Sequence, residues 1–238
     1  MVLNLETKKV RRITDGSTWY STAGGFDYAW SPDSKWFTLE FIGNKHDPYS
    51  DIGLVSAQGN GEIINLTNSG YSSGSPSFAL DGNAILFTTE RYGMRAHASW
   101  GSLDDAMLVF LNQDAYDKFS LSKEDYELYK EANSDRKKVA AKDSSKVKDI
   151  VVELKNIEDR IVRLTPNSSN MGSTLISKDG KTLYYLASTE SGRNLWKMDL
   201  NKKETKLLHK VDAGWTSLEM DKEGKTLFLS LIHIPSPR

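Results

Sequence analysis

The residues best suited to binding chemistry gather in one stretch, residues 91–101. Two arginines, a histidine, a tyrosine and a tryptophan stand within ten residues there, just after an expected strand. Loops at strand ends commonly carry ligand-binding residues, and guanidinium groups hold carboxylates through paired, charge-assisted hydrogen bonds. Arg91, Arg95 and His97 are therefore the candidate substrate-binding residues, with a peptide carboxylate as the group held by the arginines. The alternative is a structural loop, in which Trp100 packs between neighbouring elements and nearby aspartates neutralise the arginines.

Signatures of catalysis are absent from the sequence. It has no Gly-x-Ser-x-Gly elbow, no His-Glu-x-x-His helix and no glycine-rich phosphate loop. With no cysteine, it has no disulfide, thiolate zinc site or cysteine nucleophile. Residues 46–51 include types found in metal and acid–base sites, but His and Asp in such loops usually serve backbone hydrogen bonding. The sequence therefore predicts no catalytic residue, no cofactor and no metal ion in this chain.

The composition argues against some classes of binding partner. Charged residues make up 26% of the 238 residues and the formal net charge is −1, which argues against nucleic acid and anionic membrane surfaces. The lysine-rich residues 136–148 are interpreted as a solvated linker, because acidic residues are interspersed with the basic ones. No apolar run approaches the roughly 18–20 residues of a membrane span. No signal peptide is visible, but Met1 falls inside a repeat, so the natural chain is expected to begin upstream.

A sequence repeat predicts the strands that position the candidate residues. A polar turn followed by an aromatic and β-branched strand begins with residues 30–41 and recurs three times, with turn positions 34, 82, 180 and 224 separated by 48, 98 and 44 residues. Ser34 stands where the turn commonly carries Gly. A second pattern, two strands ending in Leu-Thr or its equivalent, runs in phase and ends at residues 14, 67, 165 and 209. Four-stranded repeats of about 40–45 residues are typical of β-propeller blades.

We therefore predict an all-β fold: a partial β-propeller with about three full four-stranded blades, two partial blades and one insertion. The predicted divisions are blades over 1–111, a helical and charged insertion over 112–148, blades again over 149–228, and a tail over 229–238. The tail fits no repeat and resembles the translation of a library-preparation adapter, so it is interpreted as non-native. Both flanking blades are expected to be severed. Their open strand edges would make the isolated chain poorly soluble.

The sequence also predicts a helical segment, a hairpin and the placement of four tryptophans. Residues 114–131 have helical spacing, with Ser122 as an N-cap within it. Residues 149–165 are expected to resume the interrupted blade as a hairpin. The tryptophans at 30, 36, 196 and 215 are expected in the core or between blades, because they stand at blade-internal spacing.

Six segments match a known pattern: residues 28–33, 36–37, 44–52, 90–101, 125–128 and 158–165. Together they resemble the propeller region of bacterial tricorn-type proteases, over residues 1–228. The 90–101 loop and the insertion are the specific part. The Trp-Ser-Pro-Asp turn alone is shared with the Tol-system propeller protein and with prolyl-oligopeptidase-type propellers.

The resemblance implies a large serine peptidase. In that family two propellers precede a PDZ-bearing catalytic region related to C-terminal processing proteases, and they filter and channel peptides. The implied partners are peptide or unfolded polypeptide substrates, the remainder of the parent peptidase, and further copies in a homo-oligomer. The implied compartment is the cytoplasm, with the periplasm left open because the natural N-terminus is missing. No catalytic residue of the family lies in this chain. The alternatives are a non-enzymatic protein-interaction propeller of the Tol-system type and, third, the propeller of a prolyl-oligopeptidase-type enzyme.

Overall fold

The computed structural model describes residues 1–16, 27–43, 47–59, 61–97, 100–133, 148–189, 192–211 and 215–232. Within them, three antiparallel four-stranded sheets follow one another along the chain. Blade 1 contains β3 (Tyr28–Trp30), β4 (Trp36–Phe41), β5 (Asp51–Ser56) and β6 (Ile64–Asn65). Blade 2 contains β7 (Ser73–Ala79), β8 (Ala84–Thr89), β11 (Asp105–Phe110) and β12 (Ile161–Arg163). Blade 3 contains β13 (Asn170–Ile176), β14 (Thr182–Thr189), β15 (Gly192–Asp199) and β16 (Glu204–Lys210).

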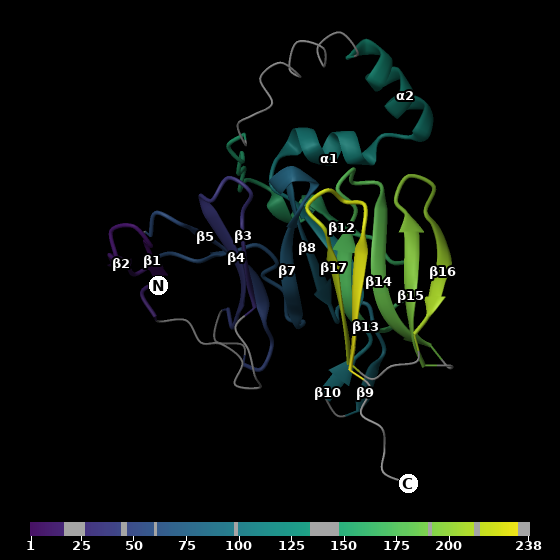
Figure 1. Ribbon diagram of the computed structural model, residues 1–238, viewed down its shortest axis with the longest axis horizontal. Coiled ribbons are helices and arrows are strands. Elements are labelled where there is room, and N and C mark those ends of the chain that lie inside the picture. The colour runs from purple at the N-terminus through teal and green to yellow at the C-terminus, as the bar shows by residue number, and fades with distance from the viewer. Residues whose placement is uncertain are drawn as a thin grey trace.

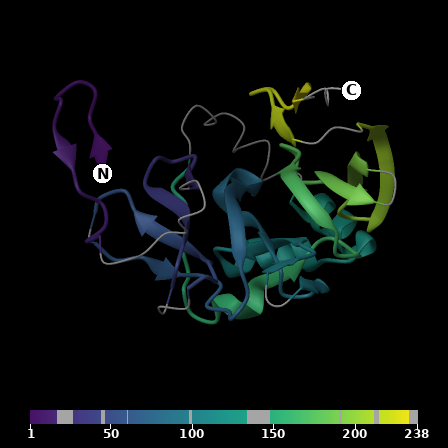
Figure 2. The same ribbon diagram turned by 90° about the horizontal axis from the view of Figure 1, so that it is seen from below.

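A two-stranded hairpin flanks the three sheets on each side. β1 (Val2–Leu3) pairs with β2 (Val10–Arg11), and β17 (Trp215–Met220) pairs with β18 (Leu227–Ile232). The sheets stand side by side in an arc, with the first hairpin at one end and the last at the other (Figures 1 and 2). The fold is a partial β-propeller, as predicted, with three full and two partial blades. Neither described helix is long and apolar enough to cross a lipid bilayer.

The core lies between the blades, and blade 2 is apolar on both faces. Alternate residues of β8 and β11 point to opposite faces of a sheet. Ile85 and Met107 belong to a cluster shared with blade 1, whereas Leu86 and Leu108 belong to one shared with blade 3. All six residues of β11 are buried. Stacking of neighbouring sheets therefore supplies the hydrophobic stabilisation that no single blade has alone.

The predicted turn chemistry is present. The Ser31 hydroxyl donates to Asp33 Oδ1 at 2.6 Å, and the same oxygen accepts from the Lys35 N–H at 3.0 Å. Ser34 adopts a φ of 59°, and Gly180, its equivalent in blade 3, a φ of 71°. This left-handed conformation favours glycine, which explains why Gly is the commoner residue at this position of the repeat.

The insertion leaves blade 2 after its third strand. It contains α1 (Gln113–Ser120) and α2 (Lys123–Ala132), and the described chain then runs from residue 148 to a 3₁₀ helix at Ile157–Arg160. Ser122 caps α2 as predicted, its side chain accepting from the Asp125 N–H. The rings of Tyr116 and Phe119 lie 5.7 and 5.0 Å from that of Phe110, so α1 covers one end of the core between blades 2 and 3.

One buried arginine fixes the returning chain. Arg160 is 3% exposed. Its guanidinium donates to the backbone carbonyl oxygens of Phe110, Glu153, Lys155 and Asn156. The N–H of Ile150 also donates to Asp33 Oδ2 at 2.9 Å, which ties the same segment to the first turn of blade 1.

The helical spacing over 114–131 is confirmed by two helices, with Leu121 and Ser122 between them. Three other expectations were wrong. Residues 149–165 do not form a hairpin: only β12 pairs there, because β11 already supplies the third strand. Trp30 is 45% exposed, although its ring lies 3.7 Å from that of buried Phe37. The stretch after β8 is a hairpin of β9 (Arg95–His97) and β10 (Trp100–Ser102) instead of a loop.

Of the remaining expectations, Trp36 and Trp196 are partly buried against the cores, as predicted. The side chain of Trp215 and the linker residues 134–147 lie outside the described part of the chain. The described strand β18 extends to Ile232. The proposed divisions at 111, 148 and 228 remain predictions.

Candidate functional site

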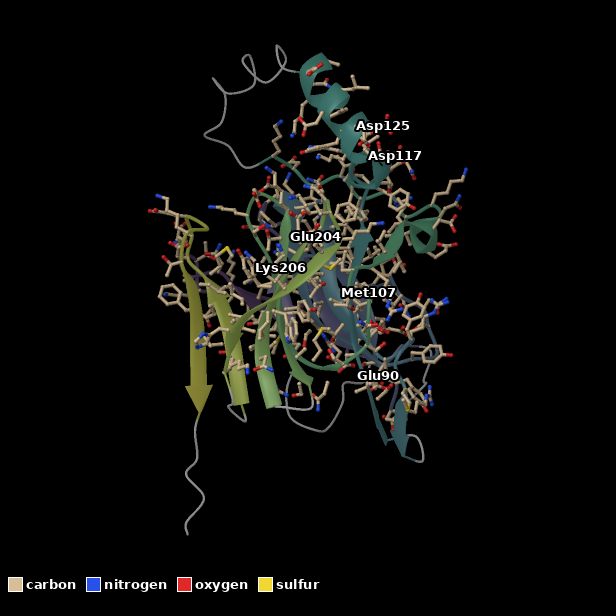
Figure 3. The ribbon with its side chains drawn as sticks, turned by 90° about the vertical axis from the view of Figure 1, so that its right-hand side faces the viewer. Glu90, Met107, Asp117, Asp125, Glu204 and Lys206 are labelled. Atoms are coloured by element: carbon tan, nitrogen blue, oxygen red, sulfur yellow. The ribbon has the colours of Figure 1, made fainter. Side chains whose placement is uncertain are left out.

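The candidate residues lie at one end of the propeller, here called the loop end. It carries the connections between second and third strands and those between blades, and it is opposite to α1 and α2. Figure 3 shows Glu90 at this end, far from Asp117 and Asp125 of the helices. Glu90 follows β8, and its N–H donates to Ser72 O at 3.0 Å, which ties the start of the β9–β10 hairpin to the blade 1–blade 2 connection.

A glycine permits the hairpin to fold back closely. A Cβ on Gly93 would lie 1.7 Å from the carbonyl oxygen of Leu103, a distance that no side chain tolerates. The Leu103 N–H donates to Met94 O at 3.2 Å, and the Ser102 hydroxyl donates to the same oxygen at 3.3 Å. These contacts fix where Arg95 leaves the hairpin.

Arg95 contacts two tyrosines from outside its own hairpin. Its guanidinium carbon lies 5.4 Å from the ring centroid of Tyr71 and 5.9 Å from that of Tyr49. Tyr49 precedes β5 in blade 1, and Tyr71 belongs to the connection between blades 1 and 2. Both distances are within the range of cation–π attraction. Arg95 is exposed, and no carboxylate among the described residues pairs with it.

Arg91 stands at the outer end of a second stack. Its guanidinium carbon lies 5.6 Å from the ring centroid of Tyr92, and that of Arg163 lies 5.1 Å from the same ring. Arg163 is locked from the inside, because its Nε and Nη2 donate to Asp105 Oδ1 at 3.0 and 2.9 Å. We call the three arginines and three tyrosines the arginine–tyrosine cluster; its members are Tyr49, Tyr71, Arg91, Tyr92, Arg95 and Arg163.

Asp105 supports this stack from within the core. Its side chain is fully buried. Besides Arg163, it accepts from the Thr165 hydroxyl at 2.8 Å and from the Ser168 hydroxyl at 2.7 Å. Buried carboxylates are stable only when paired and hydrogen-bonded. Asp105 accepts from four donor atoms, two of Arg163 and one each of Thr165 and Ser168.

Blade 1 has an equivalent buried aspartate, whose hydrogen-bond donors do not include an arginine. Asp51, 1% exposed, accepts from the Thr67 hydroxyl at 2.7 Å, from Asn65 Nδ2 at 2.9 Å and from the Ser69 N–H at 3.0 Å. In both blades an Asp opens the third strand and a Thr follows the fourth.

Hydrogen bonds of three serines hold the backbone beside the two tyrosines that contact Arg95. The Ser73 N–H donates to Ser50 O at 2.8 Å, and the Ser50 hydroxyl donates to Ser73 O at 2.9 Å. The Ser69 hydroxyl donates to Tyr71 O at 3.1 Å. The backbones beside Tyr49 and Tyr71 are therefore joined across the blade 1–blade 2 junction.

Two carboxyl groups near the cluster are hard to ionise. Burial, together with the charges of Glu90 and Asp105, raises the pKa of Asp104 to about 6, although the Met171 N–H opposes the shift. Burial also raises the pKa of Glu40, and a hydrogen bond from the Ser75 N–H opposes this shift. Asp104 exchanges both backbone hydrogen bonds with Ser169, at 2.8 and 3.0 Å, so it lies where blade 2 leads into blade 3.

The structure describes the side chains of two of the three candidate residues. Arg91 and Arg95 lie on the same connection, and both contact tyrosine rings. His97 lies in β9, but its side chain is outside the described part of the chain, as is that of Trp100. No described aspartate neutralises the two arginines, in contrast to the structural-loop alternative. Sequence reasoning missed Tyr71, Arg163 and Asp105, although the repeated Asp and Thr could have indicated Asp105.

The segment 46–51 has a structural role where it is described. Asp51 is used in hydrogen bonds, as favoured from the sequence, and His46 lies outside the described residues. Among the described residues, no group of His, Cys, Asp or Glu side chains is arranged to hold a metal ion. Each of the two exposed arginines can offer N–H groups to an oxyanion.

Several solved structures have a fold similar to that of this chain. No protein-family model and no curated protein matches the sequence. Among solved structures, tricorn protease is similar with a TM-score of 0.61 and 12% identity, over 96% of this chain and 22% of that one. TolB from Acinetobacter baumannii gives 0.53 and 16%, over 94% and 41%. A puromycin-hydrolysing peptidase from Mycobacterium tuberculosis gives 0.50 and 12%, over 84% and 27%. The likeness is one of fold, and the chain spans less than half of each of these proteins.

Proposed function

We propose that this chain is the substrate-gating propeller of a tricorn-type serine peptidase, with the catalytic region outside it. In this proposal the propeller admits peptides and unfolded polypeptides and excludes folded proteins. Arg91, Arg95 and His97 contact the passing chain at the loop end. The parent peptidase is a cytoplasmic homo-oligomer. The proposal combines the propeller fold, the tricorn-like sequence segments and the arginine–tyrosine cluster.

The observation that carries the proposal is the state of Arg91 and Arg95. Both are exposed and, within the described residues, neither is paired with a carboxylate. Each guanidinium carbon lies within cation–π distance of a tyrosine ring, and the N–H groups of both arginines are offered to a ligand in this proposal. Since a guanidinium forms two parallel hydrogen bonds with a carboxylate, peptide carboxylates are the ligand we propose.

The first strands of the blades support a channel. β3, β7, β13 and β17 each lie at an edge of their sheet, and β3 contacts β7 as β13 contacts β17. These edges therefore converge from neighbouring blades. The first five residues of β7 are Ser, Gly, Ser, Pro and Ser, which present little apolar surface to a passing chain.

A non-enzymatic interaction propeller of the Tol-system type is the second candidate. The A. baumannii TolB likeness favours it, because it covers 94% of this chain. In that case the cluster anchors a protein partner in the periplasm. The two candidates differ in the natural gene: the first requires a PDZ and processing-protease region in the same reading frame, and the second requires the frame to end soon after the ring closes.

Peptide binding tests the proposal directly. Fluorescence anisotropy would compare a labelled unfolded peptide with a free C-terminal carboxylate and the same peptide ending in an amide. We expect tighter binding of the free acid, and loss of that preference in Arg91→Ala and Arg95→Ala. Lys206→Ala on β16 removes one exposed cation far from the cluster and should change nothing (Figure 3). Equal binding of both peptides, or equal loss in Lys206→Ala, would contradict a carboxylate site at the cluster.

A further inference from the structure

Arg95 differs from an ordinary surface arginine in being contacted by two rings that its own hairpin does not supply. Tyr71 and Tyr49 lie 24 and 46 residues earlier in the sequence, and the distances to their ring centroids are 5.4 and 5.9 Å. A free arginine side chain samples many rotamers, and binding a ligand in one of them costs that freedom. Ring contacts on the guanidinium reduce this cost before the ligand arrives.

We propose that Tyr49 and Tyr71 are positioning residues that hold the Arg95 guanidinium in place, so that the loop end binds a peptide carboxylate at a reduced conformational cost. The inference rests on the proposed peptide-binding function and names the residues that position its arginine. The two rings come from blade 1 and from its connection to blade 2, so the preordered site exists only where those blades are assembled.

Hydrogen bonds hold the backbone that carries the two rings. Ser50, next to Tyr49, exchanges two hydrogen bonds with Ser73, at 2.8 and 2.9 Å. Tyr71 is held on its other side, where its N–H donates to Ser69 Oγ at 3.3 Å and its carbonyl accepts from the Ser69 hydroxyl. Both tyrosines are half-buried. They can therefore orient a neighbour.

The chemistry of the guanidinium suits a carboxylate. Its N–H groups lie in one plane and form two parallel hydrogen bonds with the oxygens of a carboxylate, whereas the ammonium of a lysine is a point charge without a plane. Arg95→Lys should therefore keep the charge and weaken carboxylate binding.

Arg91 serves as an internal comparison. Its guanidinium carbon lies 5.6 Å from the ring centroid of Tyr92, its sequence neighbour, and within the described part of the chain no cation–π contact joins it to Tyr49 or Tyr71. Tyr92→Leu is the matched control, because it removes a ring of the same size from the same cluster without touching the Arg95 pair.

The first experiment observes Arg95 without a ligand. In NMR spectra of the full chain, ring currents should shift the Arg95 side-chain protons away from the values of a solvent-exposed arginine. Tyr49→Phe and Tyr71→Phe keep the rings and should keep the shift. Tyr49→Leu and Tyr71→Leu, made singly and together, should abolish it, whereas Tyr92→Leu should leave it unchanged. An Arg95 shift that survives the double Leu variant would overturn the inference.

The second experiment measures carboxylate binding. Peptides carrying a free C-terminal carboxylate, an amide, or an internal Glu or Gln would separate terminal from side-chain carboxylates. The Leu pair should weaken carboxylate binding roughly five- to tenfold, the effect of losing about one cation–π contact. In the Arg95→Ala background the same Leu substitutions should have no further effect, and thermal unfolding would check that each variant is folded.

The outcomes separate the two ideas. If the wild type prefers free acids and Arg95→Ala loses that preference, but the Leu pair does not, the positioning role is wrong and the proposed function stands. A ring-current shift without any preference for carboxylates would uphold the positioning of Arg95 and contradict the proposed function. An equal loss for the Leu pair with and without Arg95 would assign the tyrosines to general stability.

Discussion

Replacing Asp105 by Asn is the sharpest test of how the loop end is held together. The change keeps the size of the side chain and removes its charge. Arg163 would lose the carboxylate that accepts two of its N–H groups at 2.9 and 3.0 Å, and the Ser168 hydroxyl would face an amide in place of an acceptor oxygen. Because the Asp105 side chain is fully buried, water cannot take over these bonds.

The expected loss is about 3 kcal/mol of unfolding free energy. Removing one partner of a fully buried ion pair costs about 3–5 kcal/mol. The lower end applies because the Arg163 side chain is 34% exposed and retains some hydration. For a chain of this size, 3 kcal/mol corresponds to a fall of roughly 6–12 °C in Tm. Urea unfolding followed by tryptophan fluorescence would give the free energy, and calorimetry the Tm.

Asp51→Asn is the matched control. Asp51 opens the third strand of blade 1 as Asp105 does that of blade 2, but its donors are all neutral. We expect it to cost about 1–2 kcal/mol, in the range of ordinary buried hydrogen bonds. The double variant Asp105→Asn/Arg163→Met should lose less than Asp105→Asn alone, because no unpaired cation remains. Equal losses at the two aspartates, with no recovery in the double variant, would refute this reasoning.

Three further predictions concern stability. Ser34→Gly should stabilise the protein by about 0.5–1 kcal/mol, since Ser34 has a φ of 59°, and Gly180→Ser should destabilise it; urea unfolding would measure both, and a loss in Ser34→Gly would be contrary to expectation. Folding raises the pKa of Asp104 from 3.8 to about 6, so the folded chain binds this proton more tightly and stability falls as pH rises through that window. Asp104→Asn should flatten that fall and gain about 1–2 kcal/mol at pH 7, after allowing for partial exposure; an unchanged pH profile would count against it. Arg160→Lys should cost about 2–3 kcal/mol, because one ammonium cannot reach the four carbonyl oxygens that the guanidinium serves; a Tm equal to that of the wild type would contradict this role.

The predicted repeat was accurate where the chain follows it and failed at its interruptions. The return at 149–165 looked like a hairpin because Ile150, Val152 and Leu154 alternate as in a strand. Ile150 and Val152 do pack against the core between blades 1 and 2. They do so without a strand partner, because β11 and β12 already complete blade 2. The β9–β10 hairpin was missed since its short strands lack an apolar alternation.

The sequence by itself determined the blade period, which follows from the recurrence of one pattern along the chain, and two local features, the Ser–Asp turns and the Ser122 cap. The two local features arise from interactions spanning at most about five residues, so local composition is enough to predict them. Only the tertiary structure decided that Tyr49 and Tyr71 flank Arg95, and that Arg163 reaches Asp105, 58 residues away. Those contacts form only once separate strands and blades pack together, and the repeat does not encode which side chains then meet at their ends.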